Sequence, residues 1–209
     1  MSRPERLCTE AEYLALEDNA TEKSEYVNGR MYAMSGASPN HDRIVFNATR
    51  ELANQLRGRP CRGLTADMRV KATVTGAYFY PDLGALCGTP EYTNSAGVQM
   101  LVNPSVIIEV LSESTAAFDR GEKFEHYRRI PSLREYAVIA QDRTFVELRV
   151  LRGDVWMLAA YSTPDDGVAL ASVGCTLRLR DLYENVEFPA DGARTAPRLL
   201  REDAPPAYA

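Results

Sequence analysis

The chain has 209 residues, of which 45% are hydrophobic and 25% charged, and its formal net charge is −5. This composition is ordinary for a globular domain and excludes a disulfide-dense scaffold, a collagen-like chain and a fully disordered chain. The acidic balance argues against a protein that coats nucleic acid through bulk charge, but it is compatible with an enzyme that carries a local basic patch.

The N-terminal part predicts a short helix and a hairpin. Residues 9–12, Thr-Glu-Ala-Glu, form a capping box, so a helix should begin there and end near residue 18. The pair Asn28-Gly29 between two alternating runs predicts a tight β-hairpin over residues 25–34. Glu25 should therefore lie on a strand just before the turn.

A longer helix and two strands should follow. Ser38-Pro39 is typical of a helix start, and Gly58 is placed to end the same helix. Residues 67–72 and residues 78–87 each predict a strand, whereas residues 88–102 are polar and irregular and predict a loop. The helix has an apolar residue at every fourth position: Ile44, Ala48, Leu52 and Leu56.

Residues 104–112 give the clearest strand of the chain. Its apolar residues are continuous, which predicts a central strand that is buried on both faces. Glu109 interrupts this run, and a carboxylate in such a place is costly unless it is paired or bound to a cation. A helix over residues 118–129, ended by Pro131, should come next.

The C-terminal part predicts four more strands and a short closing helix. The order of elements indicates an α/β fold, a mixed sheet flanked by helices. We expect a single domain over residues 1–188 and a mostly disordered tail over residues 189–209, which are rich in Pro, Ala and Arg. The expected strands are residues 134–140, 144–151, 155–161 and 175–179, and the short helix is residues 181–184.

Neither a membrane protein nor a secreted one is expected. No apolar run approaches the ~20 residues of a membrane helix, and no apolar signal core follows the N-terminus, which favours a cytoplasmic location. The cysteines are widely scattered and include no CxxC pair, so we expect reduced thiols rather than a zinc site or a redox pair. They are Cys8, Cys61, Cys87 and Cys175.

Three residues indicate a site for phosphodiester hydrolysis. Asp82 follows Pro81 in a predicted strand, Glu109 lies 27 residues later, and Lys123 lies on the next helix. Two carboxylates from adjacent strands, with a backbone carbonyl, can hold Mg²⁺ or Mn²⁺, and such an ion polarises a phosphoryl oxygen. A nearby lysine can stabilise the developing charge or orient the water. Glu25 is a candidate fourth member.

Each of these residues also has a purely structural explanation. Asp82 fits a turn after a proline, and Glu109 fits a buried ion pair with an arginine. Lys123 fits a solvated helix position paired with Asp119, and Glu25 fits a surface position of the hairpin. It is their joint occurrence that favours a functional site.

Several of these segments together resemble one family. They are Pro81-Asp82, residues 109–112, residues 119–123 with Tyr127, and the hairpin over residues 25–30. In this pattern the chain resembles the Uma2-family endonucleases, which are grouped in the PD-(D/E)XK, or restriction-endonuclease-like, superfamily. The resemblance covers about residues 10–186. It implies a restriction-endonuclease-like fold and a metal-dependent endonuclease that acts on nucleic acid, with DNA as the expected substrate.

The resemblance also implies roles for the four residues. Asp82 and Glu109 would hold Mg²⁺ or Mn²⁺ with help from Glu25, and Lys123 would act on the water or on the developing charge. The superfamily lysine usually lies two residues after the acidic residue, a place taken here by Leu111, so Lys123 would replace it from the following helix. Enzymes of this type often act as dimers, which implies a homodimer.

Two other functions stay open at this point. One is a catalytically degenerate member of the fold that binds nucleic acid or protein, which Leu111 and the acidic charge both favour. The other is a metallohydrolase that acts on a small nucleotide. If the basic residues near the motifs line one face, they could grip a phosphate backbone, whereas ion pairs with the 29 acidic residues would leave an ordinary solvated surface. These basic residues are Arg43, Arg62, Arg69, Lys71, Arg120, Lys123, Arg128 and Arg129.

Overall fold

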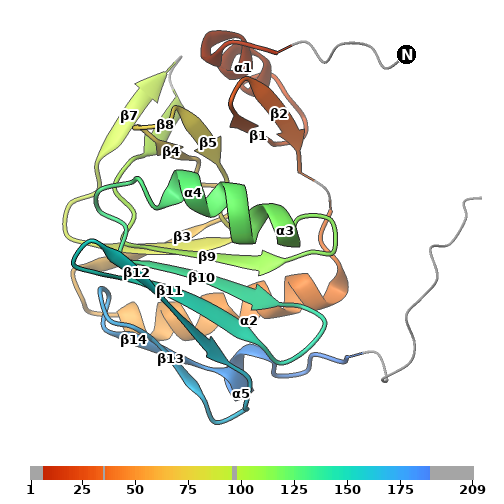
Figure 1. The fold of residues 1–209 in the computed structure, drawn as a ribbon, viewed down its shortest axis with the longest axis vertical. Coiled ribbons are helices and arrows are strands. Elements are labelled where there is room, and N and C mark those ends of the chain that lie inside the picture. The colour runs from red at the N-terminus through yellow and green to blue at the C-terminus, as the bar shows by residue number, and fades with distance from the viewer. Residues whose placement is uncertain (1–6, 35, 96–97, 189–209) are drawn as a thin grey trace, which may run out of the picture.

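Two six-stranded mixed sheets make up most of the structure (Figure 1). The structure is a computed structural model and describes residues 7–34, 36–95 and 98–188. The N-terminal sheet has the order β2 (Arg30–Ala33), β1 (Ser24–Val27), β5 (Ala77–Phe79), β4 (Val70–Ala72), β8 (Val98–Leu101), β7 (Tyr92–Ser95). The central sheet has the order β12 (Val155–Tyr161), β11 (Val146–Arg152), β10 (Glu135–Ala140), β9 (Val106–Leu111), β6 (Leu83–Cys87), β3 (Cys61–Thr65).

Helices cover both faces of the central sheet (Figure 1). One face packs on α2 (Pro39–Leu56), on the hairpin of β13 (Gly167–Leu170) and β14 (Cys175–Arg178), and on α5 (Leu179–Leu182). The other face packs on the N-terminal sheet and on a helix with three parts: α3 (Ala116–Phe118), the π-helical turn η1 (Asp119–Lys123) and α4 (Phe124–Tyr127). The remaining helix, α1 (Glu10–Glu17), lies beside β1. The mixed α/β fold with helices around a central sheet is the predicted fold class, which is thereby confirmed.

The local signals at the start of the chain produced the expected elements. The capping box of α1 is present, with the Thr9 side chain accepting from the Glu12 amide. In the β1–β2 turn, Asn28 and Gly29 have φ values of 51° and 83°, and a two-residue turn with both φ values positive matches the twist of a hairpin. α2 begins at Pro39, and the Ser38 side chain caps it by accepting from the His41 amide.

The strand predicted over residues 78–87 is wrong as a single strand. The structure divides it between β5 of the N-terminal sheet and β6 of the central sheet, with a break at residues 80–82. Pro81 explains the break, because it lacks the amide that a sheet interior requires. The chain thus passes from one sheet to the other just before Asp82.

Other parts of the prediction also differ. The loop predicted over residues 88–102 contains the antiparallel pair β7 and β8, whose polar side chains hid the pattern of a strand. β3 and β13 were not predicted, and the short closing helix begins at Leu179 rather than at residue 181. The helix predicted over residues 118–129 begins at Ala116 and includes a π-helical turn. The single domain ending at residue 188 stays a prediction, and the tail over residues 189–209 lies outside the described residues.

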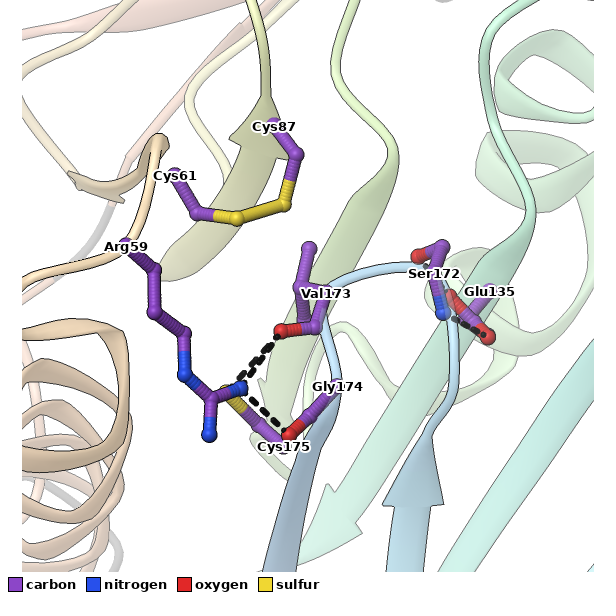
Figure 2. Close-up of a disulfide and its surroundings, with 8 residues drawn as sticks. All are labelled: Arg59, Cys61, Cys87, Glu135, Ser172, Val173, Gly174 and Cys175. Atoms are coloured by element: carbon purple, nitrogen blue, oxygen red, sulfur yellow. Dashed lines mark hydrogen bonds between the residues drawn. A yellow bond between two sulfur atoms is a disulfide. The ribbon is translucent and has the colours of Figure 1, made fainter.

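A disulfide corrects the expectation of four reduced thiols. Cys61 on β3 and Cys87 on β6 are directly opposite each other in an antiparallel pair and are joined by a disulfide (Figure 2). Sequence spacing could not reveal this pairing, because 26 residues separate the two cysteines and only the sheet brings them together. Cys8 and Cys175 are free thiols. In the described part of the chain, no helix combines the length and the apolar character needed to cross a membrane.

Candidate active site

The four predicted site residues come from four different elements. Glu25 lies on β1, Asp82 lies just before β6, Glu109 lies on β9, and Lys123 ends the π-helical turn η1. β6 pairs with β9 in the antiparallel sense, with Leu83 opposite Ile108. Asp82 itself lies in the bend before β6 and not on a strand, so only the strand that follows it is adjacent to the strand of Glu109. The site therefore lies where the two sheets and the α3–η1–α4 helix meet.

Lys123 is the centre of this arrangement. Its Nζ lies 2.9 Å from Glu25 Oε1 and 2.9 Å from Glu109 Oε1. Asp119, one turn earlier in the helix, is a third carboxylate, with Oδ1 3.5 Å from Nζ. The Lys123 side chain is only 5% exposed, and all three carboxylates beside it are buried. The structure thus brings together Glu25, Glu109 and Lys123.

The π-helical turn explains how Lys123 reaches the cluster from a helix. One residue more than an α-helical turn allows is accommodated between Asp119 and Lys123, which changes the direction of the side chains that follow. The helix is secured on both sides of the turn. The Tyr136 hydroxyl donates to the backbone carbonyl of Asp119 at 2.7 Å, and Phe124 stacks at an angle on the Tyr136 ring.

Glu109 is held by three donors in a fully buried place. Its Oε1 accepts from Lys123 and from the Tyr127 hydroxyl at 3.3 Å, and its Oε2 lies 3.4 Å from the Asp82 amide. Burial raises the pKa of the Glu109 carboxyl well above its usual range, and the neighbouring carboxylates add to this rise while the Lys123 ammonium opposes it. A cation beside Glu109 would relieve this cost by favouring the charged carboxylate.

The charge of Lys123 is maintained by the same neighbours. Burial opposes the charged form, but Glu109, Glu25 and Asp119 together raise the pKa of the lysine well above its usual value. Lys123 is therefore an ammonium in the folded protein at neutral pH. A charged amine in a site that excludes water can stabilise negative charge far better than a solvated one.

Asp82 lies beside the cluster and does not contact Lys123. The Val110 amide donates to its Oδ2 at 2.7 Å, and Nε2 of His41 lies 3.3 Å from the same oxygen. Burial lowers the pKa of His41, but the hydrogen bond and the charge of Asp82 outweigh it, so the pKa is raised overall. His41 comes from the first turn of α2, so this helix contributes to the site as well.

The donor set suits a hard cation held partly by protein. Asp82, Glu109, Glu25 and Asp119 provide four carboxylates against one lysine, so the cluster has a surplus of negative charge. Among the described residues no group of three or more His, Cys, Asp or Glu side chains is arranged to hold a metal ion. Carboxylate oxygens are ligands of the kind that Mg²⁺ prefers, and Mg²⁺ is commonly bound by one or two carboxylates and completes its shell with water and substrate phosphates.

Sequence reasoning missed part of the cluster. Asp119 was considered only as a surface partner for Lys123, yet it is buried in the site. Tyr127 and His41, which had no assigned role, both contact a site carboxylate. The signal that could have found Asp119 and Tyr127 is their spacing of four residues on either side of Lys123, which keeps all three near one helix face.

Most of the basic residues near the motifs are engaged in ion pairs. Arg69 is buried and lies 3.9 Å from Glu17, and the other pairs join Lys71 to Glu10, Arg120 to Glu147 and Arg128 to Glu125. Lys123 is buried in the site. Four of the eight are exposed: Arg43, Arg62 and Arg129, together with the paired Arg128. Of the two alternatives, the structure thus favours a solvated surface with ion pairs and not a broad basic face that grips a phosphate backbone.

The sequence matches one family model. The model is described as "Uma2: Putative restriction endonuclease", and it covers residues 10–180. Two relatives come from Synechocystis sp. (strain ATCC 27184 / PCC 6803 / Kazusa). The chain is 43% identical to the "Uncharacterized protein sll1609" over 155 residues, 73% of this chain and 86% of the relative. It is 31% identical to the "Uncharacterized protein slr1290" over 178 residues, 85% of this chain and 92% of the relative.

A solved structure has a similar fold. It comes from Anabaena variabilis ATCC 29413 and is described as "a putative nuclease belonging to DUF820". The two structures superpose with a TM-score of 0.69 at 19% sequence identity, and the match covers 84% of this chain and 97% of the other. At this level of identity the likeness concerns the fold.

Proposed function

The chain belongs to the Uma2 family, and from this premise we propose that it is a metal-dependent endonuclease that hydrolyses phosphodiester bonds of DNA. The description of the family, "Putative restriction endonuclease", supports a nuclease function, and the shared fold with a protein described as "a putative nuclease" agrees with it. The substrate and the metal are our own additions to this family-level function.

One observation carries the proposal. The buried Lys123 ammonium bridges Glu25 and Glu109 at 2.9 Å each, and Asp82 lies just before β6, the strand next to that of Glu109. A single structural ion pair would need one carboxylate, whereas this ammonium faces three. Buried charge clusters of this kind cost stability, which makes a functional reason for keeping them the better explanation.

We assign the metal ligands to Asp82 and Glu109, with Glu25 assisting directly or through water. Hard oxygen ligands suit Mg²⁺ and Mn²⁺ alike. Asp82 Oδ2 is occupied by the Val110 amide and His41, so its other oxygen is the one available for a cation. When bound, the ion supplies Lewis-acid polarisation of the scissile phosphate.

The protein residues supply orientation and charge for hydrolysis. Lys123 stabilises the negative charge that grows on the phosphoryl oxygens in the transition state, and its buried position makes this interaction strong. Tyr127 and Lys123 together fix one oxygen of Glu109, which leaves the second oxygen directed towards Asp82. The Val110 amide fixes Asp82 in the same way, so both carboxylates are oriented before the substrate arrives.

We further propose a homodimer in the cytoplasm. A second copy would bring a second site for the other strand of a duplex, and no described helix is suited to a membrane. Both statements stay predictions that sedimentation and cell fractionation can check.

The proposal is tested by a substrate panel. Supercoiled plasmid, single-stranded DNA, RNA and free nucleotides are each incubated with Mg²⁺ or Mn²⁺ and either the wild-type protein or Asp82→Asn. We expect nicking of DNA by the wild type and its loss in the variant. Cleavage of RNA alone or of nucleotides alone would overturn the substrate assignment. If the folded protein cleaves none of these substrates, the assignment as an enzyme is overturned, and a catalytically degenerate member of the fold is favoured.

A further inference from the structure

Two aromatic side chains form an exposed stack beside the candidate site. Tyr32 on β2 and Phe118 at the end of α3 lie with ring centroids 5.4 Å apart and planes inclined by 30°. Phe118 is partly buried and packs against the hydrophobic core on the α3–η1–α4 side of the central sheet. Tyr32 is 36% exposed, so it forms the outer layer of the stack. An aromatic ring stacked on an anchored ring is a rigid platform with a surface open to solvent.

The stack is joined to the site at both ends. Tyr32 is directly opposite Glu25 in the β1–β2 pair, and opposite residues of an antiparallel pair lie on the same face of the sheet. Phe118 immediately precedes Asp119, whose carboxylate faces Lys123. The platform therefore borders the Glu25–Lys123–Asp119 side of the cluster.

Hydrophobic packing alone explains only the inner ring. Phe118 contacts the core, whereas Tyr32, on the sheet-edge strand β2, belongs to none of the hydrophobic clusters formed by the described residues. Within the described residues, the Tyr32 hydroxyl has no hydrogen-bond partner among the bonds that the structure shows. Every nucleobase has a π-face, and stacking on aromatic side chains is how proteins bind unpaired bases without reading their sequence.

We propose that Tyr32 and Phe118 form a stacking platform for an unpaired nucleobase next to the scissile phosphate. This inference rests on the proposed function and makes its substrate more specific. The base must be unpaired, because the bases of an intact duplex already stack on their neighbours. The substrate is therefore a single-stranded or locally opened stretch of DNA. Tyr32 is a binding residue in this assignment and takes no part in the chemistry.

Binding without cleavage tests the platform. The probes are a fluorescein-labelled single strand of about 12 nucleotides, the same strand with abasic sites in its centre, and the matching duplex. Anisotropy is measured in Ca²⁺ with wild type, Tyr32→Leu, Tyr32→Phe and Tyr92→Leu. Tyr92 is a matched control, because it is 42% exposed and lies on β7, at the opposite edge of the same sheet.

Stacking on Tyr32 predicts a distinct set of binding affinities. The wild type should bind the single strand about tenfold more tightly than the abasic strand. Tyr32→Leu should lose this preference with unchanged affinity for the abasic strand, whereas Tyr32→Phe and Tyr92→Leu should keep it. The wild-type comparison does not depend on how any variant folds.

The contrary outcomes separate the platform from the enzyme. If the wild type binds both single strands equally, or if Tyr32→Leu keeps the preference, the platform is wrong, and cleavage of plasmid by the wild type would show that the nuclease assignment survives. If the wild type binds no DNA and cleaves none, the platform and the proposed function both fail. If Tyr32→Leu weakens binding of the abasic strand as much as binding of the intact single strand, Tyr32 acts through the structure of the protein and not through stacking.

Discussion

Lys123 neutralises only part of the negative charge that surrounds it. Its ammonium lies within 3.5 Å of Glu25, Glu109 and Asp119, and all four side chains are buried. Removing the lysine therefore leaves three carboxylates close together with no compensating charge. A buried pair that loses one partner is strongly destabilised, because the remaining charge is no longer paired.

We predict that Lys123→Met destabilises the protein in a pH-dependent manner. At about pH 8 the free energy of unfolding should fall by about 3–5 kcal/mol. The pKa of the Glu109 carboxyl is raised by burial, and in the variant it loses the opposing effect of the Lys123 ammonium and rises further above the unfolded value. The loss of stability should therefore grow as pH rises above the unfolded value and be smaller at about pH 5. Urea unfolding at both pH values measures this difference.

A half-buried lysine at the surface, Lys23, provides the control for that experiment. Lys23 pairs with Asp67, which is 89% exposed, so Lys23→Met should change the free energy of unfolding by less than about 1 kcal/mol at either pH. If Lys123→Met loses the same free energy of unfolding at both pH values, the explanation by crowded carboxylates around Lys123 is contradicted.

Sequence reasoning proposed four candidate site residues but could not predict their arrangement. Glu109 was visible because a carboxylate amid continuous apolar residues needs a partner, and the structure gives that partner as Lys123. The contact between Glu25 and Lys123 could not be predicted from spacing, because it depends on two sheets and a helix that meet in three dimensions. Whether these residues bind metal and catalyse hydrolysis stays a prediction.

At the scale of elements, the π-helical turn determines where Lys123 points. We predict that deleting Gly121 removes the π-helical turn and shifts Asp119 and α3 by one residue relative to Lys123 and α4. Asp119 and Lys123 can then no longer both keep their places in the cluster. DNA cleavage should fall by about a hundredfold or more, with the far-UV circular dichroism preserved.

The matched control keeps the length of the helix. A Cβ at Gly121 would meet no atom within 4 Å, so Gly121→Ala should preserve cleavage. It should also raise the free energy of unfolding by about 0.5–1 kcal/mol, because glycine weakens a helix interior. Full activity of the deletion variant would show that the turn does not position Lys123.

The Cys61–Cys87 disulfide allows a second prediction at the scale of elements. It closes a loop of 26 residues between β3 and β6, so reduction should lower the free energy of unfolding by about 3 kcal/mol. Figure 2 shows that Arg59 also ties this region to the carbonyls of Val173 and Gly174, so β3 should stay in place in the reduced native protein.

Unfolding by urea with and without a thiol reductant measures the effect. The double variant Cys61→Ala/Cys87→Ala should resemble the reduced wild type and should not respond to the reductant. If the oxidised and the reduced wild type are equally stable, the disulfide does not stabilise the fold.

The predictability of each element followed the strength of its local signal. Asn28-Gly29 and the continuous run of β9 each allow one structure, and both were predicted correctly. β7 and β8 were missed because residues such as Thr93, Asn94 and Gln99 carry no apolar alternation, and backbone pairing forms the strands regardless. The break between β5 and β6 had a local signal, because Pro81 lacks an amide, but the assignment of the two halves to different sheets depends on tertiary context.

At the scale of the whole molecule, the net charge of −5 limits how the protein can hold DNA. With five of the eight candidate basic residues buried or paired with carboxylates, about three phosphate contacts are available. We predict that the logarithm of the DNA-binding constant falls with the logarithm of salt concentration with a slope no steeper than about −3. Anisotropy titrations at several salt concentrations measure it. A slope near −8 would mean that the ion pairs open to bind phosphates.

The measurement that tests the catalytic centre most directly compares two buried glutamates on adjacent parallel strands. Glu109 is 3% exposed on β9, and Glu135 is 2% exposed on β10, where it accepts from the Ser172 amide at 3.0 Å. Supercoiled plasmid is cleaved with Mn²⁺ by Glu109→Gln and Glu135→Gln under identical conditions. We predict that Glu109→Gln loses about a hundredfold or more of the nicking rate and Glu135→Gln keeps it. Wild-type nicking by Glu109→Gln, with Glu135→Gln impaired, would contradict the assignment of the active site.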